Sequence, residues 1–208
     1  RYWDTVNQRF TYQVHWLDDA PINLALSTQQ RQVNLALPAG GNPQRRQFAQ
    51  RLYHQAGDDP IAYTNAIAQW MRSQQFRYTL SPPTLGSNRI DDFLFATRAG
   101  FCEHYASSFT YLMRAAGVPA RVVAGYQGGQ LGRDGKSWEV RQMDAHAWSE
   151  IWVQGRGWVR VDPAGFDGHN RVEPGFDTDP KDAAAAVVGK GVEGQISYQQ
   201  IHMLQQSR

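Results

Sequence analysis

The chain contains a single cysteine, Cys102, at a position suited to nucleophilic chemistry. It follows Gly100 and Phe101 and begins a stretch in which apolar residues recur at helical spacing. The free N–H groups and positive end of a helix favour a thiolate, which is the reactive form of cysteine. A lone cysteine is also commonly a small buried hydrophobic residue. Cys102 therefore supports catalysis only together with suitable partners.

A nucleophilic cysteine needs a base that takes its proton and an acceptor that orients the base. His146 begins a strand candidate at 146–153, and Asp162 ends the next candidate at 157–162. A three-residue loop between these strands would align an aromatic pair, Trp152 with Trp158, and an ion pair, Glu150 with Arg160.

In that register, His146 and Asp162 are diagonal neighbours on one face of the sheet, close enough for the imidazole to reach the carboxylate. A loop of two or four residues would place them on opposite faces, because a one-residue slip reverses every side chain. The alternative is a strand histidine with an incidental carboxylate nearby. The sequence thus predicts an odd loop or a glycine bulge at 154–157, and a triad of Cys102, His146 and Asp162.

The other candidate ligands and bases have weaker support. His104 lies two residues after Cys102, and side chains at that spacing do not face each other on a helix, so His104 is interpreted as structural or as a wall of the site. His146 and Glu150 are four residues apart on a strand, where they need not converge as zinc ligands do on a helix. No metal and no cofactor is expected.

The fold must bring these candidate residues together. Along the chain, the predicted helices come before the predicted strands. Helical patterns follow Pro43, run from Pro60 to Met71, form a short turn at 89–97 and begin again at Cys102. Four strand candidates follow, at 121–126, 137–142, 146–153 and 157–162, with the hairpin signal Asp134-Gly135 among them. Helices followed by an antiparallel meander predict an α+β fold.

Composition limits the possible classes of function. The 208 residues include seven Trp, nine Tyr and nine Phe, enough for a real core. The net charge is only +2 and no basic run exists, so nucleic-acid binding has no electrostatic support. Mean hydropathy is −0.58, and no long apolar stretch predicts a membrane span. Because the chain starts with Arg1 rather than Met, it is interpreted as a piece of a longer protein.

Five stretches, in order, resemble the motifs of bacterial transglutaminase-like proteins. They are Arg98–Ala106 around the cysteine, Met113–Val123, Gly125–Gly129, Asp144–Glu150 around the histidine, and Gly157–Pro163 around the aspartate. The resemblance spans roughly residues 60–175. It is closest to membrane proteins of the TgpA type, in which a soluble domain of this kind lies outside the inner membrane. One departure is Ala164, where relatives often have Thr.

This resemblance implies a papain-like core with the nucleophile at a helix N-terminus, packed on a small antiparallel sheet. Residues 43–165 would form the catalytic core, with arms at 1–42 and 166–208. Cys102 would be the nucleophile, His146 the general base and acid, and Asp162 the orienting carboxylate. The side chains expected to line the substrate site are Trp148, Tyr126 and His104.

The implied reaction is that of a transglutaminase. Cys102 forms a thioester with a glutamine side chain of a protein or peptide donor, and a primary amine then takes the acyl group. The resemblance also implies the periplasmic domain of a bacterial inner-membrane protein. Two other functions stay open. If water takes the acyl group, the same residues make a cysteine hydrolase that acts on proteins or peptidoglycan stems. If the residues catalyse no reaction, the domain is a non-catalytic binding module.

Overall fold

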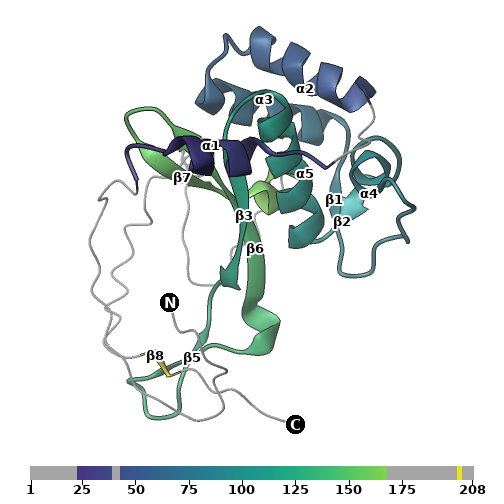
Figure 1. The fold of residues 1–208 in the computed structure, drawn as a ribbon. Helices are drawn as coiled ribbons and strands as arrows, with labels where there is room; N and C mark the ends of the chain where they lie inside the picture. Colours follow the sequence, from purple (N-terminus) through teal and green to yellow (C-terminus); the bar gives the residue numbers. More distant parts are fainter. Residues whose placement is uncertain (1–22, 39–42, 168–200, 203–208) are drawn as a thin grey trace.

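The computed structural model of the chain describes residues 23–38, 43–167 and 201–202, so most of the two expected arms lies outside the described residues (Figure 1). The α-helices are α1 (Thr28–Leu35), α2 (Pro43–Gln55), α3 (Pro60–Ser73), α4 (Arg89–Asp91) and α5 (Cys102–Ala115). A π-helical segment, η1 (Asp92–Thr97), and two 3₁₀ turns, η2 (Gln142–Asp144) and η3 (Pro163–Asp167), complete the helical elements.

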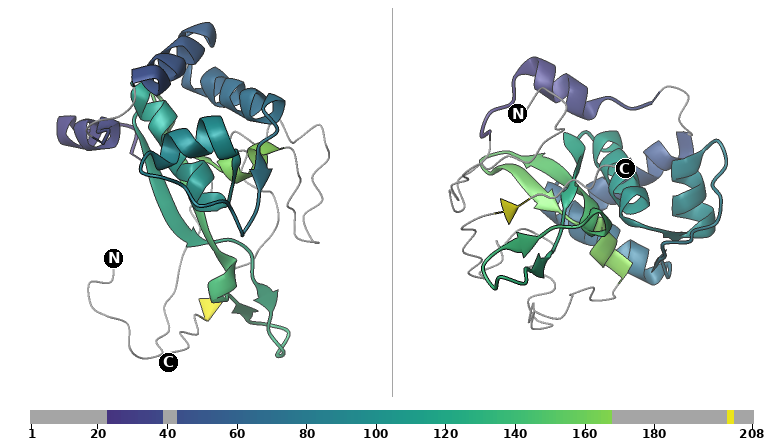
Figure 2. Two further views of the ribbon diagram at one scale, coloured as in Figure 1. Left: turned by 90° about the vertical axis from the view of Figure 1, so that its right-hand side faces the viewer. Right: turned by 90° about the horizontal axis from the view of Figure 1, so that it is seen from below.

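The strands form three small sheets. They are β1 (Arg77–Tyr78), β2 (Ala99–Gly100), β3 (Ala120–Tyr126), β4 (Gln130–Leu131), β5 (Trp138–Glu139), β6 (Ala145–Val153), β7 (Gly157–Val161) and β8 (Ile201–His202). The central sheet is antiparallel, in the order β3-β6-β7, while β4, β5 and β8 form a separate sheet. The helices α2, α3 and α5 lie together, and the β4–β5 hairpin projects away from them (Figure 2).

The β6–β7 register is the one predicted from the sequence. Trp152 pairs with Trp158, and Val153 pairs with Gly157, which leaves a three-residue loop at 154–156. Gly155 and Gly157 both have a φ of 78°, a conformation that glycine adopts without steric cost. Glycine at these two positions therefore allows the odd loop on which the predicted contact between His146 and Asp162 depends.

Two helices with defined ends build the core. The α3 helix begins where the Asp59 side chain accepts a 2.7 Å hydrogen bond from the Ala62 N–H, with Pro60 as its first residue. The α5 helix ends before Gly117, whose φ of 88° suits the left-handed position after a helix. Both helices contribute fully buried side chains: Tyr63, Ile67, Met71, Tyr105, Phe109, Leu112 and Met113.

The α5 helix packs directly on the middle strand of the sheet. The Ser149 hydroxyl of β6 donates to the Ala106 carbonyl of α5 at 3.0 Å, and it lies 3.0 Å from the Thr110 hydroxyl. Ile151, also on β6, is completely buried. The α+β architecture predicted from the order of elements is confirmed. The packing of α5 on β6 brings the start of α5 close to one end of β6.

Several elements differ from the sequence prediction. The strand expected at 137–142 is shortened to the two residues of β5, because the chain turns into η2 at Gln142. The hairpin predicted at Asp134-Gly135 is present, with the Asp134 carboxylate accepting from the N–H groups of Lys136 and Ser137. The parallel pairing of β1 with β2 was not predicted, since no pattern identifies partners for two-residue strands.

The two regions interpreted as arms also contact the core where they are described. In the N-terminal region, the α1 helix was not predicted; Ser27 caps it and Gln30 completes a capping box. The Arg114 guanidinium donates to the Ala36 carbonyl at 2.8 Å. At the other end, Phe166 is fully buried against Phe109, so the core continues past residue 165.

Candidate active site

The first residue of α5 is Cys102, as the sequence predicts. The residues around the start of this helix are closely packed. A Cβ on Gly100 would come within 2.8 Å of the His104 side chain and 2.9 Å of the Phe93 side chain. The Phe101 N–H donates to Nδ1 of His104 at 3.3 Å, so His104 caps the helix from inside its first turn. The thiol is partly exposed at this helix terminus.

At the end of β6, His146 lies against the carboxylate of Asp162. Nε2 of His146 is 2.6 Å from Oδ2 of Asp162, while the other carboxylate oxygen accepts from the Ala164 N–H at 3.2 Å. The side chains of His146 and Asp162 are 15% and 29% exposed, so the pair is partly shielded from water. The predicted contact is present, and because Nε2 is occupied, Nδ1 is the nitrogen left for the thiol.

Electrostatics favour an ion pair between the thiol and the imidazole. A hydrogen bond to the His146 side chain lowers the pKa of Cys102; burial opposes this, and the backbone N–H groups of Ala147 and Glu103 add to the lowering. Burial lowers the pKa of His146, but the hydrogen bonds to Asp162 and Cys102 outweigh it and raise that pKa to about 9. Both shifts therefore favour a thiolate beside an imidazolium.

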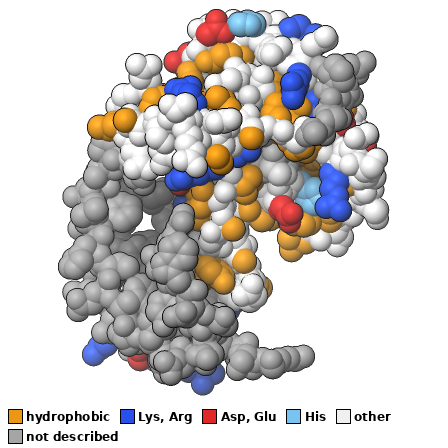
Figure 3. Space-filling view, in the orientation of Figure 1, with side chains coloured by type: hydrophobic (Ala, Val, Ile, Leu, Met, Phe, Trp, Pro, Cys, Tyr) orange, Lys and Arg blue, Asp and Glu red, His pale blue; other side chains and the backbone are white. Residues whose placement is uncertain are grey.

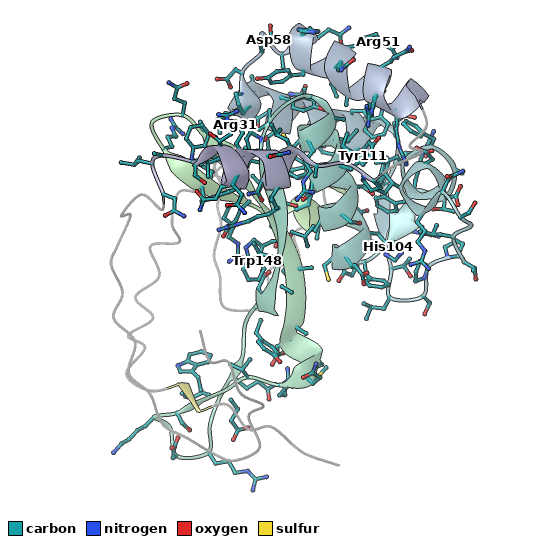
Figure 4. All side chains as sticks on the ribbon, viewed as in Figure 1. Arg31, Arg51, Asp58, His104, Tyr111 and Trp148 are labelled. Atoms are coloured by element: carbon teal, nitrogen blue, oxygen red, sulfur yellow. The ribbon has the colours of Figure 1, made fainter. Side chains whose placement is uncertain are left out.

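The three side chains expected to line a substrate site lie in different places. The Trp148 ring stacks near His146, with centroids 6.4 Å apart and planes at 21°. The His104 ring packs against Phe101, where it serves the helix start. Tyr126 is 45% exposed at the end of β3, with its hydroxyl near Gln142. Figure 4 shows Trp148 beside β3 and β6, and His104 beside the lower end of α5.

The described surface includes an apolar area over β3 and a small pocket at the start of α5. Figure 3 shows hydrophobic side chains gathered on the viewed face over β3, and Val122 of that strand is 44% exposed. A small pocket next to the start of α5 is lined by Leu85, Arg89, Ile90, Phe93, Glu103, His104, Ser107 and Ser108. Burial lowers the pKa of His104, which favours the neutral form of this ring.

Sequence reasoning missed the backbone groups that contact Cys102 and Asp162. The N–H of Ala147 faces the thiol, and the N–H of Ala164 faces the carboxylate of Asp162. Such donors leave no signature in a side-chain pattern, because every residue except proline carries one. The structure also shows that Ala164, the departure from the family pattern, uses its backbone rather than its side chain at this point.

Two further findings concern metals and membranes. Among the residues that the structure describes, no group of three or more His, Cys, Asp or Glu side chains is arranged to hold a metal ion. Within the same residues, no helix has the length and apolar character needed to cross a bilayer.

Comparison with known proteins identifies close relatives. A Pseudomonas aeruginosa protein named protein-glutamine gamma-glutamyltransferase is 45% identical over 172 residues, which are 83% of this chain and 26% of that protein. The Bacillus subtilis protein YebA, described as uncharacterized, is 33% identical over 113 residues, 51% of this chain and 15% of that protein. The chain thus spans about a quarter or less of the length of these two relatives.

A solved structure and a family model agree with this result. The crystal structure of the periplasmic domain of TgpA from Pseudomonas aeruginosa is 46% identical, with a TM-score of 0.64, over 69% of this chain and 49% of that one. A family model described as the transglutaminase-like superfamily matches residues 46–163, more than half of the chain. The resemblance seen in the sequence motifs is confirmed: the fold is transglutaminase-like, and the chain belongs to the transglutaminase-like superfamily.

Proposed function

We propose that this domain is a protein-glutamine gamma-glutamyltransferase, a thiol acyltransferase that uses Cys102, His146 and Asp162. The observation that supports this most directly is the chain of contacts from thiol to imidazole to carboxylate at the start of α5. The three residues have the side-chain types and the mutual contacts that a nucleophile, a base and an orienting group require. The name of the Pseudomonas relative supports the choice of glutamine as acyl donor.

The reaction starts with attack of the Cys102 thiolate on the carboxamide carbon of a glutamine side chain. A tetrahedral oxyanion forms, and the backbone N–H of Cys102 at the helix start stabilises it. The His146 imidazolium gives its proton to the departing nitrogen, so ammonia leaves and a thioester remains. Asp162 holds the imidazole so that Nδ1 faces the sulfur throughout.

The second half of the reaction releases the acyl group. A primary amine attacks the thioester carbonyl while neutral His146 accepts the proton from the amine nitrogen. The C–S bond then breaks, the new amide leaves, and the thiolate–imidazolium pair is restored. When water replaces the amine, the product is a carboxylic acid, and the domain acts as a cysteine hydrolase. How far the site excludes water during this step decides between the two acceptors.

The relatives support a proposal for the cellular setting. The solved neighbour is the periplasmic domain of TgpA, and this chain covers only a quarter of the curated Pseudomonas protein. We therefore place the domain in the periplasm, as part of a longer protein anchored in the bacterial inner membrane. Its partners are a protein or peptide that carries the glutamine and a primary-amine acceptor.

Incubation of the domain with a glutamine-bearing protein and a fluorescent primary amine tests this function. Covalent fluorescence on the protein, lost in Cys102→Ala, is the expected result. Ammonia or peptide release without amine incorporation would identify a hydrolase instead. A matched control is His54→Ala, because His54 is an exposed residue at the end of α2 that contacts Asp58. If Cys102→Ala kept every activity of the unchanged domain, the thiol would not be needed, and the domain would be a non-catalytic binding module.

A further inference from the structure

The Trp148 indole lies close to both the imidazole of His146 and a guanidinium. Its ring is nearly parallel to that of His146, with planes at 21° and centroids 6.4 Å apart. The guanidinium carbon of Arg160 is 4.2 Å from the centre of the indole. His146, Trp148 and Arg160 lie on the same face of the central sheet, because Arg160 pairs with Glu150, which is two residues along β6 from Trp148.

Gly125 makes the space that the indole occupies. Gly125 pairs with His146 across the β3–β6 ladder, so it lies on the same face of the sheet. A Cβ at this position would come within 2.7 Å of Cη2 and 3.1 Å of Cζ3 of Trp148. Real Cβ contacts are not this short, so any side chain at 125 must displace the indole. The absence of a side chain at Gly125 therefore determines where Trp148 can lie.

Among the described residues, the end of β6 is paired with β3 but not with β7. The β6–β7 ladder runs from Val153 to Ser149, and its last pair is Ser149 with Val161. His146 and Trp148 lie beyond this last pair. Within the described residues, the buried Nε1 of Trp148 has no hydrogen-bond partner, so no polar contact fixes the indole. Its position rests on ring packing, on Arg160 and on the gap at Gly125.

From this packing we propose that Trp148 is a positioning residue for His146, and that Gly125 and Arg160 hold Trp148 in place. The proposal rests on the function proposed above, because it explains how the base of that reaction is kept in position. The flat indole restricts rotation of the imidazole, which keeps Nε2 toward Asp162 and Nδ1 toward the thiol.

Small displacements at such a site have large effects on rate. A shift of about 1 Å in a catalytic group costs on the order of 10²-fold in rate. Because Gly125 has no positive φ, alanine fits its backbone, and the change acts through the contact with Trp148. Gly125→Ala is therefore a more specific perturbation than removal of the tryptophan, which would also leave a cavity.

The test compares Gly125→Ala, Trp148→Phe and the double variant with the unchanged domain. We expect Gly125→Ala to lower kcat for amine incorporation by about 10-fold or more, with little change in KM. Trp148→Phe keeps an aromatic face and is expected to be milder. In the double variant, the smaller ring clears the alanine, so kcat should return to the level of Trp148→Phe. Full activity of Gly125→Ala, or a double variant no better than Gly125→Ala, would overturn the proposal.

A second readout does not depend on enzyme activity. The pKa of His146, measured by NMR titration of the resting domain, should fall from about 9 toward its ordinary value of 6.5 in Gly125→Ala. It should recover in the double variant. This measurement remains informative even if the unchanged domain transfers no acyl group, which would reject only the proposed function. An unchanged His146 pKa in Gly125→Ala would reject the positioning role.

The matched control is Trp152→Leu. Trp152 lies on the same face of β6 and is also covered by an arginine, with Arg31 5.4 Å from its ring centre. It is six residues from His146, and its Nε1 donates to the Asn23 carbonyl at 2.9 Å. Its loss is expected to affect stability but not the His146 pKa. An equal shift of that pKa in Trp152→Leu would overturn the proposal, because it would show a general loss of sheet structure.

Discussion

Nε2 of His146 lies 2.6 Å from Oδ2 of Asp162, and this contact determines which nitrogen of the ring faces Cys102. With Nε2 as donor to the carboxylate, Nδ1 is available to accept the proton of the thiol. The carboxylate is itself held by the Ala164 N–H at 3.2 Å. The carboxylate that contacts the imidazole is therefore itself fixed by a backbone hydrogen bond.

Asp162→Asn tests this orientation. The amide keeps the shape of the side chain but cannot supply a negative charge to the imidazolium, and it can present N–H instead of oxygen to the ring. We expect the fold to be kept and kcat to fall by about 10³-fold to 10⁴-fold, because the wrong tautomer is favoured. Steady-state kinetics of amine incorporation and circular dichroism measure the two effects. A rate close to that of the unchanged domain would remove Asp162 from the triad.

The reactivity of the thiol reports on its interaction with His146. Since Cys102 is the single cysteine of the chain, alkylation by iodoacetamide measures its thiolate fraction alone. The hydrogen bond to His146 is the largest cause of the lowered Cys102 pKa. His146→Gln should therefore move the midpoint of the alkylation rate to higher pH. His54→Gln is the matched control and should leave it unchanged; identical midpoints in all three proteins would contradict the ion pair.

Activity should depend on pH through the same two groups, which titrate as a coupled pair. The active form needs a thiolate and an imidazolium, so it exists above the lowered pKa of Cys102 and below the His146 pKa of about 9. The value of kcat/KM should decline as pH rises through about 9, and in Asp162→Asn this decline should begin at lower pH. A profile still rising above pH 10 would contradict the assignment.

The raised pKa of His146 also makes the stability of the fold depend on pH, because the group binds its proton more tightly in the folded state than in the unfolded state. Because the folded pKa of His146 is raised above 6.5, protonation stabilises the fold fully below about pH 6.5. This contribution is lost as pH rises through about 9. The lowered pKa of Cys102 acts in the opposite sense, because a thiol that ionises more readily in the folded state adds stability as pH rises. Urea unfolding of Cys102→Ala, which lacks this opposing contribution, should therefore show a loss of stability as pH rises above 6.5, and this loss should be smaller in the double variant with Asp162→Asn.

The sequence predicted the parts of the fold that depend on pairing rules. The alignment of Trp152 with Trp158 and of Glu150 with Arg160 identified one register, and that register brought His146 to Asp162. The start of α5 at Cys102 followed from helical spacing after Gly100. These features were predictable because local patterns in strands and helices have fixed periods.

Other features depended on contacts between distant segments. The indole of Trp148 contacts Arg160 and the space left by Gly125 of another strand, and the sequence pattern shows neither contact. Its expected role in substrate binding stays a prediction. The α1 helix carries no buried residue, so it shows no apolar stripe that would predict it. Backbone donors such as the Ala147 N–H are present in every sequence and become specific only when the chain folds.

His104→Ala separates a structural role from substrate binding. The Nδ1 atom of His104 accepts from the Phe101 N–H, so its loss leaves a helix-start donor unpaired. We expect the free energy of unfolding to fall by about 1 kcal/mol, with KM for the glutamine donor unchanged. His104→Asn offers another short acceptor and should lose less. A KM raised several-fold in His104→Ala without loss of stability would instead assign His104 to the substrate site.

The hydroxyl pair between α5 and β6 holds the two halves of the site together. Ser149 and Thr110 lie in the core, with Ser149 fully buried and 3.0 Å from the Thr110 oxygen. Ser149→Ala removes the acceptor of that contact and the donor to the Ala106 carbonyl, which should cost about 1–3 kcal/mol of stability. Urea unfolding of the single variant measures this loss.

The double variant shows whether the cost comes from unpaired polar groups or from lost packing. Replacing both hydroxyls, in Ser149→Ala with Thr110→Val, leaves no unpaired side-chain oxygen, so it should cost less than the sum of the two single variants. The pKa of Cys102 should be unchanged in each variant, because neither hydroxyl contributes to it. If the double variant lost as much stability as the sum of the two single variants, the two hydroxyls would not depend on each other. The pair would then stabilise the contact between α5 and β6 only by filling volume in the core.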